Sequence, residues 1–364
     1  MGRLGVGIIG TGMIGQVHAD AARRSGALII GVSGSSVDSA QAAVEAWASE
    51  GRAMQVEEML SDPVVSVVHL CVPNHLHEAF ATRVLEAGKH VVCEKPLSLD
   101  LAGARRMTEL AGRSGLVAAV PFIYRYHPLV AEARSRTRTG NVGDVRLIHG
   151  SYLQDWLSDP AAHNWRVDAA RGGASRAFAD IGSHWCDVVE WVSGHRLTEV
   201  QAMTQTVPRD RIAAGTAQDP TRTEDIACVN FRTDKGAVGT VVVSQVSPGR
   251  KNRLWFEISG TESGISFDQE QPEGLWVGSR SGIQTVLRDP AFLSPEAAAL
   301  PNLPPGHAQG YNDCFAAFVM DVYAAVAGRS EERMPTFSDG VRAAVITDAV
   351  LTSAQKNSWV DVQH

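Results

Sequence analysis

The chain has 364 residues, more than a single hydrophobic core usually supports, so two domains are expected. Its 33 basic and 40 acidic side chains give a formal net charge of -7, which argues against nucleic acid as the main partner. The five cysteines form no C-x-x-C pair, so neither a zinc site nor a disulfide framework is expected, and no metal is predicted. No apolar run reaches the length of a membrane span, and the amino terminus shows no secretory leader. We therefore expect a cytoplasmic protein that does not bind membranes.

The first third of the chain alternates short apolar runs with segments of helical spacing. The apolar runs are rich in β-branched residues, as is typical of strands that are buried on both faces. Because strands that alternate with helices form a parallel sheet, we predict a doubly wound α/β domain of the Rossmann type. The predicted strands are Leu4–Ile9, Leu28–Val32, Val65–Cys71, His90–Cys93 and Val117–Val120, and the clearest helices are Gly15–Ser25 and His77–Gly88.

After Pro121 the pattern changes to consecutive strand-like runs, which predicts an antiparallel sheet in a second, α+β domain. The predicted domains are 1–121 and 122–364. Two stretches rich in Pro, Gly, Asp and Ala, at 207–224 and 288–310, are expected to form long loops. A last helix is expected at 338–356, and whether it packs back on the first domain is left open. The other predicted elements are a helix at 129–139 and strands at 145–153, 197–206, 226–232, 237–246, 253–259 and 264–267.

A glycine-rich motif, Gly10-Thr11-Gly12-Met13-Ile14-Gly15, directly follows the first predicted strand and opens the first predicted helix. This context turns a weak G-x-G-x-x-G match into a strong one. Gly10 permits a tight turn, Gly12 lets the backbone approach a pyrophosphate, and Gly15 allows the helix to pack close to the strand. The motif predicts a dinucleotide site at the positive end of the helix, with Thr11, Met13 and Ile14 among the contacts.

The loop after the second predicted strand bears on the choice between NAD and NADP. In NAD-specific sites an Asp or Glu about 20 residues after the glycine motif binds the ribose. Here the loop contains Ser33, Ser35 and Ser36, and the first carboxylate is Asp38, which is better explained as part of the following helix start. The serines are able to donate to a 2′-phosphate, although no Arg stands in the loop to pair with its charge. The cofactor choice stays undecided between NAD and NADP, with a slight preference for NADP.

Two short motifs follow the third and fourth predicted strands, Val72-Pro73-Asn74-His75 and Cys93-Glu94-Lys95-Pro96. The carboxyl ends of parallel strands border the crevice where open α/β sheets bind ligands. We therefore expect Asn74 and Lys95 to face the nicotinamide half of the cofactor. The proline after Lys95 restricts the lysine backbone to extended conformations, which helps to direct its side chain. A solvated surface lysine is the alternative interpretation.

A carboxylate and an imidazole are predicted to share one face of a helix in the second domain. Residues 175–193 have helical spacing, and Asp180 and His184 are four positions apart. Oxidation of an alcohol requires a base for the hydroxyl proton, and a histidine with a pKa near neutrality suits this transfer. Asp180 is suited to orienting the imidazole or to holding a substrate hydroxyl. A helix-capping and packing pair is the alternative.

Together these motifs closely resemble those of the glucose-fructose oxidoreductase, inositol dehydrogenase and rhizopine catabolism (Gfo/Idh/MocA) family, and the resemblance spans most of the chain. It implies a Rossmann domain, an open-faced antiparallel sheet used for oligomerisation, and a substrate cleft between the domains. It also implies a catalytic triad of Lys95, Asp180 and His184, with His184 as the base and Lys95 stabilising the charge on the reacting oxygen. The residues that carry the resemblance are Gly10–Gly15, Pro73-Asn74 with His77, Glu94-Lys95-Pro96, Tyr124-Arg125-Tyr126-His127-Pro128, and Asp180 with His184. Further cofactor contacts are implied at Cys71, Pro73, His77, Glu94, Lys95 and Arg125.

The expected activity is an NAD(P)-dependent transfer of a hydride between the nicotinamide and a hydroxyl-bearing carbon of a sugar, sugar derivative or inositol. Amides and carboxylates bind sugar hydroxyls, while indole rings cover apolar ring faces. The sequence departs from many family members at Ser175-Arg176, where small apolar residues are common, and this puts the local substrate contacts in doubt. The candidate substrate contacts are Lys95, Tyr124, Tyr152, Gln154, Trp165, Arg166, Asp180, His184 and His307.

Two other functions stay open. One is a regulator that binds nucleotide and sugar without turnover, although retention of Lys95, Asp180 and His184 speaks against it. The other is an enzyme that keeps its cofactor bound and cycles it internally, as in epimerising, glycoside-cleaving or coupled oxidoreductase types. The expected assembly is a homodimer or homotetramer.

Overall fold

The computed structural model describes residues 3–159, 162, 164–207, 223–300, 303–329 and 331–363. Most of the loop predicted at 207–224 therefore lies outside the described residues. The chain forms two compact units, one of residues 1–126 and 311–341 and the other of residues 127–310 and 342–364. The first unit thus includes a segment, 311–341, that the sequence analysis assigned to the second domain. The domain boundary at 121/122 stays a prediction.

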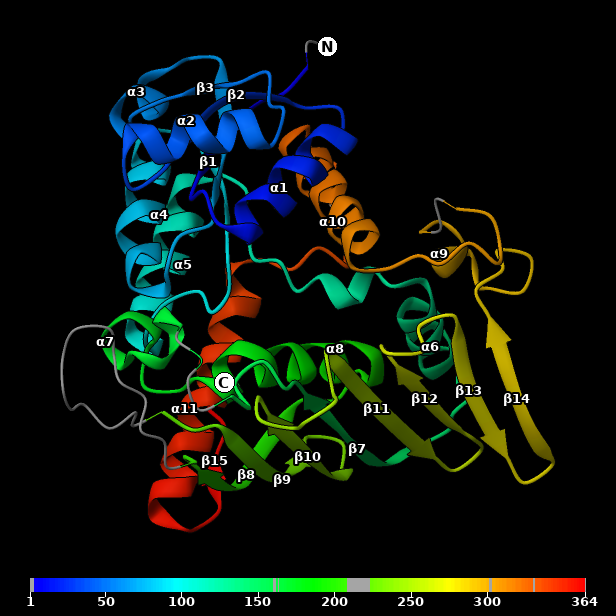
Figure 1. Cartoon of the computed structure of the whole chain (residues 1–364). Helices are drawn as coiled ribbons and strands as arrows, with labels where there is room; N and C mark the ends of the chain where they lie inside the picture. The colour runs from blue at the N-terminus through cyan, green and yellow to red at the C-terminus, as the bar shows by residue number, and fades with distance from the viewer. Residues whose placement is uncertain are drawn as a thin grey trace. The chain divides into compact units, whose positions relative to one another are not determined.

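The first unit is built on a six-stranded sheet in the order β3-β2-β1-β4-β5-β6 (Figure 1). Every neighbouring pair is parallel, which confirms the predicted Rossmann-type sheet. The strand order reverses between β1 and β4, and such a reversal is where open α/β sheets bind their ligands. The short strand β3 was not predicted. The strands are β1 (Gly5–Ile9), β2 (Leu28–Ser33), β3 (Arg52–Ala53), β4 (Val65–Leu70), β5 (His90–Cys93) and β6 (Ala118–Ala119).

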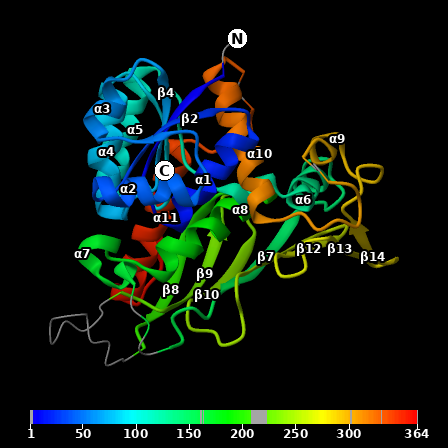
Figure 2. The ribbon, with the colours of Figure 1, turned by 45° about the horizontal axis from the view of Figure 1, so that its top comes forward.

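Helices cover both faces of this sheet. In Figure 2, α4 and α5 lie on one side of it, while α1 packs with α10 on the other. The amphipathic α1 buries His18, Ala19 and Ala22, and α10 buries Phe315 and Phe318 against it. The sequence analysis did not assign α10. The helices are α1 (Met13–Arg24), α2 (Val37–Ala46), α3 (Val56–Ser61), α4 (His77–Glu86), α5 (Leu101–Ser114) and α10 (Tyr311–Val326), with 3₁₀ turns η1 (Asn74–Leu76) and η2 (Ile123–Tyr126).

The second unit is built on a nine-stranded sheet in the order β14-β13-β12-β11-β7-β10-β9-β8-β15. The predicted antiparallel sheet is confirmed, although it is mixed, because β10 runs parallel to β7. The chain passes through α8 and the β8–β9 pair before β10 lies beside β7, so β10 arrives in the same direction. Strands β13, β14 and β15 were not predicted. The strands are β7 (Val145–Leu153), β8 (Leu197–Gln205), β9 (Ile226–Thr233), β10 (Val238–Ser244), β11 (Arg253–Gly260), β12 (Gly264–Asp268), β13 (Gly274–Ser279), β14 (Gly282–Leu287) and β15 (Val360–Asp361).

One face of the second sheet packs on helices. Trp185 of α8 stacks edge-on against Phe231 of β9 and donates its indole N–H to the carbonyl of Trp255 at 2.8 Å. Strands such as β9 and β10 alternate buried and more exposed residues, so the other face is more open, with Met203 68% and Val238 52% exposed. The helices are α6 (Pro128–Arg138), α7 (Ala169–Gly172), α8 (Ser183–Ser193), α9 (Pro295–Ala298) and α11 (Phe337–Lys356), with a 3₁₀ turn η3 (Trp165–Val167) and a π-helical turn η4 (Phe178–Gly182).

Within the described ranges, no helix combines the length and the apolar character needed to cross a membrane.

Candidate functional site

The three glycines of the first motif play different parts in the first unit. Gly10 has φ +118°, and a Cβ there would lie 2.2 Å from the Cys71 carbonyl oxygen. A Cβ on Gly15 would lie 2.2 Å from the Gly10 carbonyl oxygen. A Cβ on Gly12, in contrast, would meet nothing within 4 Å. The protein interior therefore explains Gly10 and Gly15, whereas the open space over Gly12 fits a ligand that approaches its backbone.

The start of α1 is free to bind an anion. Its N-cap, Gly12, offers no side-chain capping bond, and the first turn contains no acidic residue. Met13 is 76% exposed and Thr11 and Ile14 are half-buried, so all three border the open side of this helix end. Uncapped N–H groups at a helix start favour phosphate, and this arrangement fits a pyrophosphate group.

The parallel register brings several predicted cofactor residues to one edge of the sheet. Gly10 donates its N–H to the Ser33 carbonyl at 2.8 Å, and Cys71 donates to the Ile9 carbonyl at 2.7 Å. Glu94 likewise donates its N–H to the Leu70 carbonyl at 3.1 Å. The ends of β1, β2, β4 and β5 thus adjoin one another. Cys71 itself is buried, and burial raises the pKa of its thiol. Its side chain therefore stays uncharged at this edge of the sheet.

The serine loop after β2 has fewer free hydroxyls than the sequence suggested. Ser33 is buried. Ser36 is the N-cap of α2, and it forms a reciprocal capping box with Ser39, each side chain accepting from the other's backbone N–H at 3.1 Å. Ser35 is exposed. Of the three predicted phosphate ligands, two are therefore committed to burial or to the helix cap.

His77 joins the two loops that carry the second and third motifs. Its ring is fully buried, with Nδ1 2.9 Å from the Pro96 carbonyl oxygen and Nε2 2.9 Å from that of Val72. Burial lowers the pKa of His77, so the ring is neutral and donates to one of the two carbonyls. Pro73 is half-buried and Asn74 is buried at the start of the turn that His77 supports. The geometry gives His77 a role in holding the loops rather than in contacting a ligand.

Lys95 is half-buried and follows the carboxyl end of β5, which ends at Cys93. Glu94 is buried, and its Oε2 accepts the N–H of Lys95 at 3.1 Å. The Lys95–Pro96 peptide bond is cis. The backbone of the candidate catalytic lysine is therefore fixed on both sides, by a carboxylate and by a proline.

Tyr124 and Arg125 lie in the turn η2 and are both buried. Arg125 donates to Asp339 at 2.7 Å, and Thr336 donates its N–H to the same carboxylate at 2.7 Å. Burial of Asp339 opposes ionisation, but Arg125 and Thr336 outweigh it and lower the pKa of this carboxyl. The Arg125 guanidinium is thus at least partly committed to a structural ion pair.

In the second unit, Asp180 and His184 lie on two kinds of helix. A single α-helix was predicted over 175–193, but the structure has a π-helical turn at 178–182 followed by α8. Such single π turns concentrate at functional sites. His184 is buried and its ring centroid lies 6.5 Å from that of Tyr152. Asp180 lies on the π turn itself.

Two residues face the Asp180 carboxylate. Gln245 is fully buried and donates its amide N–H to Oδ2 at 2.7 Å, and Arg166 has its Nε 3.9 Å from Oδ1. Sequence reasoning predicted Arg166 but missed Gln245. The sequence signal for Gln245 was its position directly after the valine-rich strand β10, where a polar side chain stands at the end of a strand.

The start of the Asp180 helix is held by buried charges. Glu224 accepts the N–H of Arg176 at 3.1 Å and that of Phe178 at 2.9 Å, and it accepts the hydroxyl of Ser175 at 2.6 Å. Arg176 is 2% exposed and forms an ion pair with the equally buried Asp225. Ser175 and Arg176, which depart from the family pattern, therefore serve to fix this helix.

Tyr152 and Gln154 meet at a third residue. The hydroxyl of Tyr152 and the amide of Gln154 both donate to Oδ1 of Asn252 at 2.8 Å, and Trp156 donates its indole N–H to Gln154 at 2.8 Å. Tyr152 is 2% exposed, so its ring is mainly a packing group. Asn252 was missed because it stands between Lys251 and Arg253 in a segment that reads as a charged turn.

Trp165 and Arg166 form a stacked pair on η3, with the guanidinium carbon 4.5 Å from the indole centroid. His307 is distant in sequence and exposed. Its segment is anchored by the buried Arg288, which bonds Glu273 at 2.9 Å and donates to the carbonyls of Leu303 and His307. The structure thus shows how the proline-rich segment is docked.

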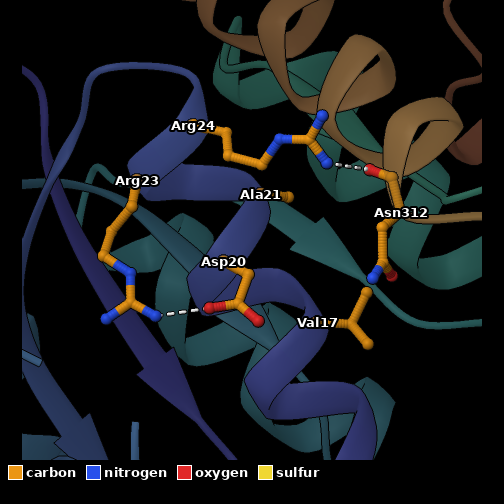
Figure 3. Close-up of a pocket in the computed structure, with 6 residues that line it drawn as sticks. All are labelled: Val17, Asp20, Ala21, Arg23, Arg24 and Asn312. Carbon is orange, nitrogen blue, oxygen red and sulfur yellow. Dashed lines mark hydrogen bonds and ion pairs between the residues drawn. The ribbon is translucent and has the colours of Figure 1, made fainter. Parts of the chain in front are cut away.

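A surface cavity of about 260 Å³ lies between α1 and α10, away from the glycine motif. Figure 3 shows Arg23 directed to Asp20 and Arg24 directed to the carbonyl of Asn312. Both guanidinium groups therefore have protein partners. The cavity gives no sign of a second ligand site.

Comparison with known protein families gives two matches in succession. The model described as an oxidoreductase family with an NAD-binding Rossmann fold matches residues 4–122, and the GFO/IDH/MocA C-terminal domain model matches residues 130–266. Levoglucosan dehydrogenase of Pseudarthrobacter phenanthrenivorans is 32% identical, with 100% of this chain and 99% of that protein covered. Inositol 2-dehydrogenase of Rhizobium meliloti is 24% identical, with 98% of each covered.

Solved structures agree with these relatives. Levoglucosan dehydrogenase in complex with NADH and L-sorbose superposes with a TM-score of 0.93 at 31% identity, covering 100% of both chains. Its complex with NADH and levoglucosan gives 0.93 at 32% identity, also over 100% of both. The fold class, the dinucleotide-binding domain and the oxidoreductase activity predicted from the sequence are confirmed.

Proposed function

Because this chain belongs to the Gfo/Idh/MocA family of oxidoreductases, we propose that it oxidises a secondary hydroxyl of a cyclic sugar, with an anhydrosugar of the levoglucosan type as the preferred class. The observation that carries the proposal is the full-length match to levoglucosan dehydrogenase, combined with a lysine at the end of β5 and an Asp–His pair on the π-turned helix. Sugars fit such a site because each ring hydroxyl both donates and accepts hydrogen bonds.

Lys95, Asp180 and His184 take part in one reaction in this proposal. A bound nicotinamide would supply the hydride acceptor, so the hydroxyl proton would be left for the protein to take up. His184 takes that proton, because imidazole is the side chain whose ordinary pKa lies nearest neutrality. Lys95 hydrogen-bonds the reacting oxygen and stabilises its developing negative charge. Asp180 orients the imidazole or binds a neighbouring hydroxyl, and Gln245 holds the carboxylate at 2.7 Å.

NAD rather than NADP is the proposed working cofactor. The slight preference for NADP rested on three serines, of which Ser33 is buried and Ser36 caps α2. A 2′-phosphate also needs a cationic partner, and none stands in the 33–39 loop. Levoglucosan dehydrogenase binds NADH. Titration of the purified protein with both cofactors tests this, and an NADP affinity tenfold or more above that of NAD would restore the earlier preference.

Self-association through the open face of the second sheet is the proposed assembly, as a homodimer or homotetramer. Exposed apolar side chains on this face, including Leu147, Met203, Val238 and Val242, support it. All five cysteines are free thiols, which fits the proposed cytoplasmic location. Sedimentation at micromolar concentration tests the assembly, and a clean monomer would contradict it.

The decisive experiment is a screen for NADH formation with levoglucosan, other anhydrosugars, aldoses, sugar acids and inositols. We expect levoglucosan or a related anhydrosugar to be turned over. Lys95→Met should lower kcat by about a thousandfold or more while nucleotide binding persists, because it removes charge stabilisation of the reacting oxygen. Lys89→Met is the matched control, since Lys89 precedes the opposite end of β5 and donates to the Asp62 carbonyl at 2.8 Å. If no compound in the screen is turned over while nucleotide binding is intact, the result favours a regulator or an enzyme that cycles its cofactor internally.

A further inference from the structure

A chain of buried polar side chains runs through the first unit and ends beside Lys95. The Tyr323 hydroxyl on α10 lies 3.0 Å from Nε2 of His69 on β4. Nδ1 of His69 lies 2.8 Å from Nδ1 of His18 on α1, and Nε2 of His18 lies 3.2 Å from Oε1 of Glu94. The other oxygen, Oε2, accepts the N–H of Lys95 at 3.1 Å. Both histidines are fully buried.

The chemistry of the groups lets this chain form complete hydrogen bonds. Burial and the neighbouring His18 keep the pKa of His69 well below its ordinary value, so its ring is neutral and has one donor and one acceptor. Burial raises the pKa of Tyr323, so its hydroxyl keeps its proton and is able to donate. Two proton arrangements complete the chain: either Tyr323 donates to Nε2 of His69 and the Nδ1–H of His69 donates to His18, or the Nδ1–H of His18 donates to His69 and the Nε2–H of His69 donates to Tyr323. In both arrangements the Nε2–H of His18 donates to Glu94. Every hydrogen bond is satisfied, and the series ends on a carboxylate.

We propose that His18, His69 and Tyr323 are positioning residues for Lys95, and that they act by fixing the Glu94 carboxylate which holds the lysine backbone. This inference rests on the proposed function in assigning a catalytic role to Lys95. The chain links α10, β4 and α1 in series to the Glu94 carboxylate, so elements distant in sequence jointly support the end of β5.

Packing alone gives a poor account of the chain. Buried imidazole and phenol groups lose their hydration and are retained where they form complete networks. Leu and Phe would fill the same space between α1, β4 and α10, where Phe315 already stacks on His18 at a centroid distance of 4.6 Å. The network instead ends on the peptide N–H of the candidate catalytic residue.

The first test is Tyr323→Phe, which removes only the oxygen at the far end of the chain. Tyr126→Phe is the control, because Tyr126 is a fully buried tyrosine of the same unit that packs against Phe318 of α10. With the substrate found in the screen, we expect Tyr323→Phe to lower kcat about tenfold, with KM and nucleotide affinity within about twofold of wild type. Tyr126→Phe should keep the wild-type kcat at a comparable thermal midpoint. Equal kcat values for the two variants would overturn the proposal.

A second measurement does not depend on turnover. In ¹⁵N-labelled protein, Nε2 of His18 should carry a proton and His69 should be a neutral ring with one protonated nitrogen, with each assigned by its His→Asn variant. The backbone amide signal of Lys95 should shift in Tyr323→Phe and stay in place in Tyr126→Phe. If the backbone amide signal of Lys95 does not shift in Tyr323→Phe, the positioning role is refuted even if the enzyme is active. If the Lys95 amide signal shifts as expected but no substrate in the screen is turned over, the positioning role stands and the proposed function is wrong.

Discussion

The two units hold their candidate catalytic residues by different means. Lys95 follows a parallel strand, and its supporting carboxylate, Glu94, is bonded through the neutral ring of His69 and its neighbour His18. Asp180 lies on a π turn whose start is fixed by buried charges, the Arg176–Asp225 pair and the Glu224 carboxylate. One site is thus supported by a hydrogen-bonded chain through the buried rings of His69 and His18, and the other mainly by ion pairs.

The difference matters because the two kinds of support respond differently to change. Removing one neutral partner from a hydrogen-bond chain costs about 1–3 kcal/mol, whereas leaving a buried charge without its partner costs about 3–5 kcal/mol. We therefore expect the support of Asp180 to govern the stability of its unit, and that of Lys95 to affect mainly its alignment.

The largest effect should come from Asp225→Asn. The substitution leaves the guanidinium of Arg176, which is 1% exposed at its side chain, without its carboxylate. We expect the free energy of unfolding of the second unit to fall by about 3–5 kcal/mol, measured by chemical denaturation. Asp313→Asn is the control, because its pair with Arg24 is partly exposed and worth less than about 1 kcal/mol. A loss of similar size in both variants would show that the buried pair is not special.

A double variant sharpens this result. Arg176→Met combined with Asp225→Asn removes both charges, so it should recover part of the stability that Asp225→Asn loses. No recovery would mean that Asp225 acts chiefly through its bond to the Val207 N–H, at 2.7 Å.

A smaller effect is expected from His127, the N-cap of α6 in the second unit. Burial, together with the charge of Arg288, lowers the pKa of His127 to about 3. Below pH ~6.5 the unfolded chain takes up a proton that the folded protein refuses, so stability falls with falling pH. From pH ~8 to pH ~5 this contributes a loss of about 2 kcal/mol.

His127→Asn keeps an acceptor for the Leu129 N–H, which His127 now binds at 3.2 Å, and removes the titration. The pH dependence of the unfolding free energy should flatten by about 2 kcal/mol over the same range. An unchanged slope would show that other groups account for the acid sensitivity of this unit.

The smallest expected effect is that of Gln245→Leu on catalysis. Loss of the 2.7 Å bond to Asp180 should lower kcat about tenfold with nucleotide affinity unchanged. Gln245→Glu should lower kcat further, because it places a second carboxylate against Asp180. Gln41→Leu, on the exposed face of α2, is the control and should match wild type. If Gln245→Leu keeps full activity, Arg166 at 3.9 Å is enough to hold Asp180.

Local sequence patterns were sufficient for the parts of the fold in which each element signals itself. The strand ranges of β5 and β7 were predicted to the residue, because polar residues bound each run at both ends. The glycine motif was recognisable because its spacing and its position between a strand and a helix are both local. The unpredicted α10 is apolar around most of its circumference, so it lacks the one-sided pattern of a surface helix.

The sequence by itself determined the family, the parallel order of the first unit and the chemical identity of the candidate catalytic residues. Only the tertiary structure decided which residues support them, since Gln245, Glu224, Asn252 and Tyr323 lie far along the chain from the side chains they contact. It also decided that β10 runs parallel to β7 and that the Asp180 helix opens with a π turn. Such features depend on long-range packing and on where a buried polar group finds its partner, and no local spacing encodes either.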